Sequence, residues 1–596
     1  MMRFLSFTIS ILFFVSCSAP TSDPIQTIAE PTTSEKLNQL LTDYSEEGLK
    51  LYPLEATSMG DNRYNDQMPN FLSDDFVNAE KAYFEKYKKL LIEINASDLS
   101  ESEKLSKATL TWELEMSLNK FNFNESLTPI NQMWTLHLTF GQLASGSGAQ
   151  PFKTVDDYNN WVKRVDGYLE WLKSAELKMK DGIAANHVLP KSLIVKVIPQ
   201  LKAMITSDVK SHLFYQPIVN LPESFSDEDK AKLTKVYTDM VANKVVPAYQ
   251  ATYDFMSSEY LEAGRTSSGI DDTPNGKAFY NHQIKKYTTT NMTAQEIHNL
   301  GLSEVDRIST EMEKVKTQVG FEGDLKSFFD FVRNNKELMP YSEPQQIIEN
   351  FNTIHERMKP QIEKLFGLTP KTGFEVRQTE KFREASASAE YNQGSMDGTR
   401  PGIFYTPIPD ASKYNIFSDE ALFLHEAIPG HHLQISLTQE SSALPEFRKT
   451  LWYSAYGEGW ALYCESLGKE LGLYTDPYQY FGMLGMEMHR AIRLVVDPGI
   501  HALGWTREKA IQYSLDHEAE GEASIISEIE RYMANPGQAL SYKIGQLKIL
   551  DLRAKAEKAL GDKFDIKQFH NEVLETGCIP LALLEAKIDK WIAESK

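Results

Sequence analysis

The side chains best suited to chemistry lie in one short segment, HEAIPGHHLQ, which begins at His425. A zinc hydrolase needs two imidazoles on one helix face and a carboxylate that activates water, and the spacing His-Glu-x-x-His provides them. Here Pro429 and Gly430 intervene, so the next histidines follow six and seven residues after His425. His431 can share a metal with His425 only if Pro429 and Gly430 bulge out of the helix. The alternative is a His-Glu pair that precedes a helix end by coincidence.

A second carboxylate of interest lies in the segment YGEGWALYCE, at Glu458. It follows His431 by 27 residues, which leaves room for one helix to end and a second to return antiparallel beside it. This arrangement predicts Glu458 as the third metal ligand, and the alternative is a surface residue near a helix start. Glu465 is one heptad later. It is either a carboxylate that orients an imidazole or a solvated helix residue.

Three segments together carry a resemblance to a known family: HEAIPGHHLQ, YGEGWALYCE and RYMANPGQALSYKIGQ. They resemble the signature segments of a bacterial family labelled domain of unknown function 885, which is grouped with the gluzincin (thermolysin-like) metallopeptidase clan. The resemblance covers nearly the whole mature chain. It implies a mainly helical, cleft-shaped metallopeptidase-like fold that holds one zinc ion.

The resemblance also implies a role for each residue of the site. His425 and His431 would be zinc ligands, Glu426 the general base and Glu458 the third ligand. A His-x-Leu pattern that starts at the second histidine favours His431, and His432 remains the rival ligand.

A Gly-rich segment, DGTRPGIFY, precedes the histidine segment and contains Arg400 and Gly402. It resembles the edge strand of the clan, which can pair with an extended peptide through main-chain hydrogen bonds. Arg400 and Gly402 are therefore candidate substrate-binding residues. The alternative is an ordinary hairpin.

Two further candidates come from the last third of the chain. Tyr542 is favoured over Lys543 as the group that stabilises the oxyanion of a tetrahedral intermediate, and the alternative is a buried helix tyrosine. Arg493 lies in a segment rich in histidine and charge, where an arginine could hold a substrate carboxylate with two hydrogen bonds. The alternative there is a set of ion pairs within one helix.

The rest of the chain must position these residues. Apolar residues three and four apart predict long helices from Lys36 to about Leu365, most clearly over 76–94, 231–261 and 293–319. Helix caps are expected at Ser226 and at Thr293 with Glu296. Segments 373–379, 385–391 and 403–407 predict two or three short strands, after which helices are expected over 418–438, 451–470, 479–496, 507–514, 522–533 and 537–560.

The expected fold is therefore mainly α with a small β-sheet, arranged as two helical lobes around a cleft. No stretch after residue 35 has the composition of a linker, so residues 35–596 are expected to form a single metallopeptidase-like catalytic domain.

The N-terminus predicts export. A positive residue precedes an apolar run from Phe4 to Val15, which is too short to span a bilayer and indicates a signal peptide over residues 1–16. The sequence FVSC resembles a bacterial lipobox and predicts lipidation of Cys17. Residues 17–34 then form a flexible tether. The expected location is a bacterial membrane, with the protein held by lipid alone and facing the periplasm or the exterior.

Composition narrows the function. The chain has 62 Lys and Arg against 83 Asp and Glu, a net charge of −21, which argues against a nucleic-acid partner. The leading hypothesis is a zinc-dependent hydrolase of peptide bonds in which Glu426 activates a metal-bound water. The alternatives are an inactive metallopeptidase-fold binding protein and a carbohydrate hydrolase that uses two carboxylates. Endo- or exo-action, side-chain preference and oligomeric state stay open.

Overall fold

The computed structural model describes residues 30–596 except for 134, 147, 382, 383, 385, 386, 397 and 399. The predicted signal peptide, Cys17 and most of the predicted tether lie outside the described residues. Helix α1 begins at Thr33, two residues before the predicted start of the domain, because Thr32 and Glu35 form a capping box there. Within the described residues, no helix is both long enough and apolar enough to cross a membrane.

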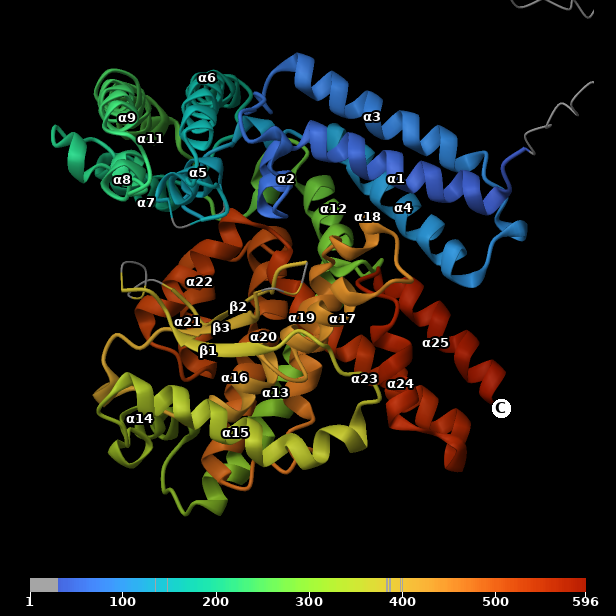
Figure 1. Cartoon of the computed structure of the whole chain (residues 1–596). Coiled ribbons are helices and arrows are strands. Elements are labelled where there is room, and N and C mark those ends of the chain that lie inside the picture. The colour runs from blue at the N-terminus through green and yellow to red at the C-terminus, as the bar shows by residue number, and fades with distance from the viewer. Residues whose placement is uncertain are drawn as a thin grey trace, which may run out of the picture.

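Helices of the first half of the chain form the upper part of the molecule in Figure 1. Beside one another lie α1 (Thr33–Leu51), α3 (Asp74–Ile92) and α4 (Glu101–Asn119), and the short α2 (Pro53–Ser58) lies at the left end of α1 in this view. The second group contains α5 (Leu136–Ala144), α6 (Val155–Ala184), α7 (Lys191–Ala203), α8 (Gln216–Val219), α9 (Asp227–Met240), α10 (Val246–Phe255) and α11 (Leu261–Ala263).

The predicted long helices of this half are present. The one expected over 231–261 is α9 to α11, joined by π-helical turns at Val241–Val245 and Met256–Tyr260. The first of these turns precedes Pro247, which has no N–H to donate to a regular helix. The Ser226 cap is also confirmed, since its side chain accepts a hydrogen bond from the Asp229 N–H.

Helices α12 (Gly276–Thr288), α13 (Ala294–Gln318), α14 (Leu325–Asn334) and α15 (Pro344–Leu365) lead to a three-stranded sheet. Its strands are β1 (Phe374–Gln378), β3 (Gly402–Thr406) and β2 (Glu390–Asn392), in that order across the sheet. β3 pairs parallel with β1 and antiparallel with β2. The small sheet was predicted, but the expectation that the segment before the histidines is an edge strand is wrong. β3 is the central strand, and its backbone is already paired on both sides.

The remaining helices contain the residues of the predicted site. They are α16 (Asp419–Glu426), α17 (His431–Glu440), α18 (Glu446–Lys449), α19 (Ser454–Ser466), α20 (Pro477–Ala502), α21 (Arg507–His517), α22 (Glu522–Ala534), α23 (Ser541–Leu560), α24 (Ile566–Leu574) and α25 (Leu581–Ser595). In Figure 1 the sheet is drawn in front of α20, and α23, α24 and α25 lie to the right of the sheet. The prediction of a single helix over 418–438 is wrong, because the helix is interrupted between the end of α16 at Glu426 and the start of α17 at His431.

Close packing of α19 on α23 holds the centre of this region. A Cβ added at Gly459 would lie 2.5 Å from the Gly545 Cα, and one at Gly545 would lie 1.8 Å from the Ala455 carbonyl oxygen. Glycine at both positions therefore lets the two helix backbones approach.

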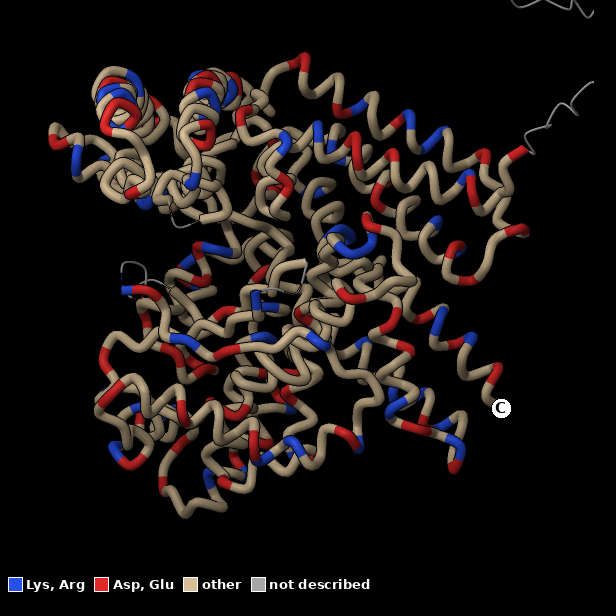
Figure 2. The backbone as a smooth tube through the Cα atoms, in the orientation of Figure 1, with Lys and Arg blue, Asp and Glu red and all other residues tan. Residues whose placement is uncertain are grey.

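Apolar side chains of the described residues form separate clusters. The largest contains residues between Leu193 and Ile592 and surrounds the site helices. A second contains residues between Met68 and Tyr260, most of them in the α5 to α11 group. Acidic and basic positions alternate along the exposed helices in Figure 2, as expected of solvated surfaces.

Candidate metal centre

The two predicted histidine ligands are brought together by a turn between two helices, and not by the expected bulge within one helix. His425 is in the last turn of α16, and His431 is the first residue of α17. Between them the chain folds back so closely that a Cβ at Gly430 would lie 1.9 Å from the His425 carbonyl oxygen. The Trp460 indole N–H donates to the Pro429 carbonyl at 2.9 Å and ties this turn to α19.

The imidazoles of His425 and His431 meet the carboxylate of Glu458. The Glu458 Oε2 lies 3.5 Å from the His425 Nε2 and 3.4 Å from the His431 Nε2. One ligand atom from each of the three residues lies within 4.8 Å of the other two, and both histidines are buried. The structure thus brings together all three residues that the sequence predicts as metal ligands.

Glu465 orients His425, which decides between its two predicted roles. Its Oε1 is 2.7 Å from the His425 Nδ1, and the carboxylate is fully buried on α19. An ionised carboxylate only accepts hydrogen bonds, so the Nδ1 carries a proton and the Nε2 is the ring nitrogen directed at Glu458. A carboxylate behind a histidine is the usual support of a metal ligand.

The electrostatics of the cluster favour a cation. Burial lowers the pKa of His425, but hydrogen bonds with Glu458 and Glu465 outweigh it and raise the pKa to about 10. Burial raises the pKa of Glu458, yet its hydrogen bonds with His425 and His431 bring it well below the ordinary value. Two imidazole nitrogens and a carboxylate directed at one point form a donor set that suits zinc. These residues fit a zinc ion.

His432, the rival ligand, faces the sheet instead. The Tyr391 hydroxyl lies 2.9 Å from its Nδ1, and its ring packs 5.0 Å from that of Phe374. Burial lowers the pKa of His432 to about 4, so the ring is neutral. Gly402 makes this arrangement possible, because a Cβ there would lie 2.2 Å from the Tyr391 hydroxyl.

Glu426 lines a cavity of about 670 Å³ together with the three ligand residues. Its side chain is largely buried, and burial raises its pKa against the opposing charges of His425 and His431. In the described part of the chain, no side chain donates a hydrogen bond to this carboxylate. It is therefore available to exchange a proton with a bound molecule.

Tyr542 and Arg493 lie in the wall of the same cavity. The Arg493 guanidinium is 4.5 Å from the centre of the Tyr542 ring and donates to Glu528 on α22 at 3.0 Å. The ion pair of Arg493 thus joins two helices rather than lying within one. Lys543 points elsewhere, into a buried contact of 2.6 Å with Glu487.

Arg400 and Gly402 do not line the cavity, so their positions give no support to a role in substrate binding. Arg400 is exposed in the loop before β3, and Gly402 is buried in the middle of the sheet. Residues 388–391, in and just before β2, line the cavity instead. Sequence reasoning missed them, although small residues ahead of a Gly-rich turn mark the segment.

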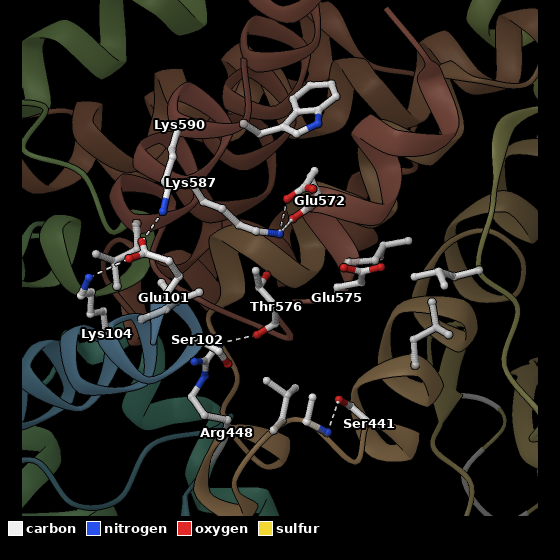
Figure 3. A pocket seen from close by; sticks show the side chains of 18 of the residues that line it. Glu101, Ser102, Lys104, Ser441, Arg448, Glu572, Glu575, Thr576, Lys587 and Lys590 are labelled. Carbon is white, nitrogen blue, oxygen red and sulfur yellow. Dashed lines mark hydrogen bonds and ion pairs between the residues drawn. The ribbon is translucent and has the colours of Figure 1, made fainter. Parts of the chain in front are cut away.

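Every residue that lines this cavity lies between Ser388 and Tyr542. Among the described residues none of α1 to α11 lines it, and the arrangement of two helical lobes around a cleft stays a prediction. A larger cavity of about 940 Å³ lies between α4, the end of α17, α24 and α25 (Figure 3). It contains none of the predicted site residues.

Comparison with known proteins places the chain in a family. A family model described as a bacterial protein of unknown function, DUF885, matches residues 53–588. The chain belongs to this family. Its DUF885 region includes every residue of the cavity described above.

Solved structures show the same fold. A "putative lipoprotein" from Colwellia psychrerythraea is 28% identical with a TM-score of 0.88, and the match covers 94% of this chain and 100% of that one. A second "putative lipoprotein", of unknown function, from Shewanella oneidensis is 18% identical with a TM-score of 0.74, covering 92% of this chain and 99% of that one. No protein of the curated set matches this DUF885 chain.

Proposed function

We propose that this protein is a zinc metallopeptidase of the gluzincin type that hydrolyses peptide bonds outside the cytoplasm. The observation that carries the proposal is the convergence of His425, His431 and Glu458 within 4.8 Å, on a cavity that Glu426 also lines. Three protein ligands on an accessible cavity leave a metal position open, which is typical of catalytic rather than structural zinc.

The residues around the centre have distinct tasks. When bound, a zinc ion would polarise the scissile carbonyl and lower the pKa of a water molecule. Glu426 accepts a proton from the attacking water and returns it to the leaving amine. The Tyr542 hydroxyl donates to the oxyanion that develops on the carbonyl oxygen. Glu465 acts through His425, whose ring it orients.

Membrane attachment through Cys17 belongs to the same proposal. The apolar run before Cys17 supports it, as does the similarity to a solved structure described as a lipoprotein. Two acyl chains hold a protein stably at a membrane, whereas one chain binds only marginally. We expect the wild type in the membrane fraction and the Cys17→Ser variant in the soluble fraction. Equal recovery of both from membranes would refute lipid anchoring.

The metal content of the purified protein tests the proposal. Wild type should contain one zinc ion per chain and should cleave members of a mixed peptide library. Glu458→Ala should lose most of the metal and the activity, while Glu575→Ala, which lines the larger cavity, should keep both. Zinc that is sub-stoichiometric in wild type and unchanged in Glu458→Ala would exclude this site.

A further inference from the structure

Arg490 lies in the wall of the catalytic cavity without an acidic partner. Its Nη1 donates to the Met486 carbonyl oxygen at 3.3 Å, within the same helix, and its Nε is buried without a hydrogen-bond partner. In the described part of the chain, no carboxylate forms an ion pair with it. A guanidinium that is partly removed from water and left unpaired is costly unless a ligand supplies the negative charge.

The charged groups around Arg490 are already engaged. Arg493 donates to Glu528 at 3.0 Å and to the Tyr532 hydroxyl at 3.0 Å. The His489 Nδ1 lies 2.5 Å from a Glu518 carboxylate oxygen. Glu518 and Glu528 are thus engaged by other cations, and the charge of Arg490 is left for a bound molecule.

Arg490 is also close to the chemistry. Burial raises the pKa of Glu426, and the charge of Arg490 is among those that oppose the rise. An anionic group held by Arg490 would therefore lie near the reacting carbonyl, in the same cavity of about 670 Å³ that Glu426 lines. Every unmodified peptide has one such negative group, the carboxylate at its C-terminus, close to its C-terminal peptide bonds.

We propose that Arg490 binds the C-terminal carboxylate of the substrate and so makes the enzyme an exopeptidase that acts from the C-terminus. The inference rests on the proposed function and specifies its substrate class. A guanidinium can hold a carboxylate through two parallel N–H···O hydrogen bonds, which gives both affinity and orientation. Such anchoring places the scissile bond at a constant number of residues from the chain end.

Matched peptides test this directly with the wild-type zinc protein. Two hexapeptide libraries of the same sequences, one with free and one with amidated C-termini, should differ about 10- to 100-fold in kcat/KM in favour of the free acids. The released C-terminal fragments should have one constant length. Acetylation of the N-terminus should matter little. Equal cleavage of acids and amides, or a loss caused by acetylation instead, would overturn the inference.

Variants assign the effect to Arg490. Arg490→Gln should lose most of the preference for free acids, measured as the ratio of kcat/KM on the two libraries, and Arg490→Lys should keep part of that ratio. Arg333→Gln, which removes an exposed arginine on α14, is the matched control. An equal loss on both libraries in Arg490→Gln would mean that Arg490 serves the transition state and not the substrate carboxylate.

A binding measurement separates this inference from the proposed function. The zinc-loaded Glu426→Gln protein should bind free-acid peptides more tightly than amides by calorimetry, even though it does not cleave them. If wild type cleaves no peptide but this preference is found, the peptidase proposal fails and the carboxylate site stands. If wild type cleaves peptides but no preference is found, the peptidase stands and the carboxylate site is refuted.

Discussion

The two main cavities of this protein differ in how their polar atoms are satisfied. The larger one (Figure 3) is lined by charges that pair with one another, such as the exposed Lys590 with Glu101 at 2.5 Å and the half-buried Lys587 with Glu572 at 2.8 Å. Arg448 is buried there and donates to the Ser106 hydroxyl and the Thr576 carbonyl, while its Nε has no partner among the described residues.

The smaller cavity has more such unpaired atoms in or beside its wall. Its candidate metal ligands are buried or nearly so, and several buried polar atoms in or beside its wall have no partner among the described residues, including the His431 Nδ1, the Glu465 Oε2, the Arg490 Nε and the Arg493 Nη1. Buried polar groups are normally paired, so a concentration of unpaired ones indicates a place made for a ligand. The volume of a cavity alone therefore does not identify the functional site, and the unpaired polar atoms favour the smaller cavity.

The assignment of catalysis to the smaller cavity, and not to the larger one, depends most on Glu426. Glu426→Gln should lower peptide hydrolysis by about 10² to 10⁴-fold, because the amide cannot accept a proton from the attacking water. Zinc content should not change, since the side chain is not a ligand. Steady-state kinetics and metal analysis check this beside Glu575→Gln from the larger cavity, which should behave as wild type. A Glu426→Gln protein that keeps its zinc and cleaves at the wild-type rate would refute the general-base role.

Glu465 tests whether the support behind the centre matters. Glu465→Gln should weaken zinc binding by about 10- to 100-fold, because the amide holds the His425 ring less firmly in its ligating tautomer. Competition with a chelator of known affinity measures the change. Glu572→Gln, the matched control, should bind zinc as wild type does. Unchanged affinity in Glu465→Gln would mean that the 2.7 Å contact with His425 is only structural.

His501 provides a contrast in the core, outside both cavities. Burial lowers its pKa to about 3, while its Nδ1 accepts the Ile270 N–H at 3.1 Å. In the unfolded chain His501 binds a proton near pH 6.5, whereas in the folded protein it stays neutral down to about pH 3. The free energy of unfolding therefore decreases as the pH falls from about 6.5 towards 3. Over that interval wild type should lose about 1.4 kcal/mol of unfolding free energy per pH unit more than His501→Gln. Urea unfolding of both proteins at pH 6.5, 5.5 and 4.5 measures the gap, and a constant gap would contradict the assignment.

The smallest effect is expected in the larger cavity. Lys590→Ala removes a pair in which the lysine and Glu101 side chains are 45% and 62% exposed. Exposed pairs contribute about 0 to 1 kcal/mol, so thermal unfolding should barely shift, and hydrolysis should not change. A large loss of activity in Lys590→Ala would show that the larger cavity also takes part in function.

Much of the secondary structure could be predicted because it depends on neighbours along the chain. Apolar spacing placed α13, and the capping box of Thr293 and Glu296 marked its start. The exception is the helix predicted over 418–438, where local periodicity continues across Pro429 and Gly430 although the chain turns back. That turn is held by contacts with Trp460 and Cys464 on α19, more than thirty residues away.

The sequence by itself determined the types of the chemical groups: histidine, glutamate, histidine and a second glutamate in an order that suits a metal. Only the tertiary structure decided that His431 joins His425 while His432 turns to Tyr391, that Glu465 stands behind His425, and that β3 is central. Only the tertiary structure shows that Arg490 lies in the wall of the smaller cavity without an acidic partner among the described residues. The physical reason is that such choices depend on burial and hydrogen bonds between segments far apart in the sequence, which no local spacing encodes.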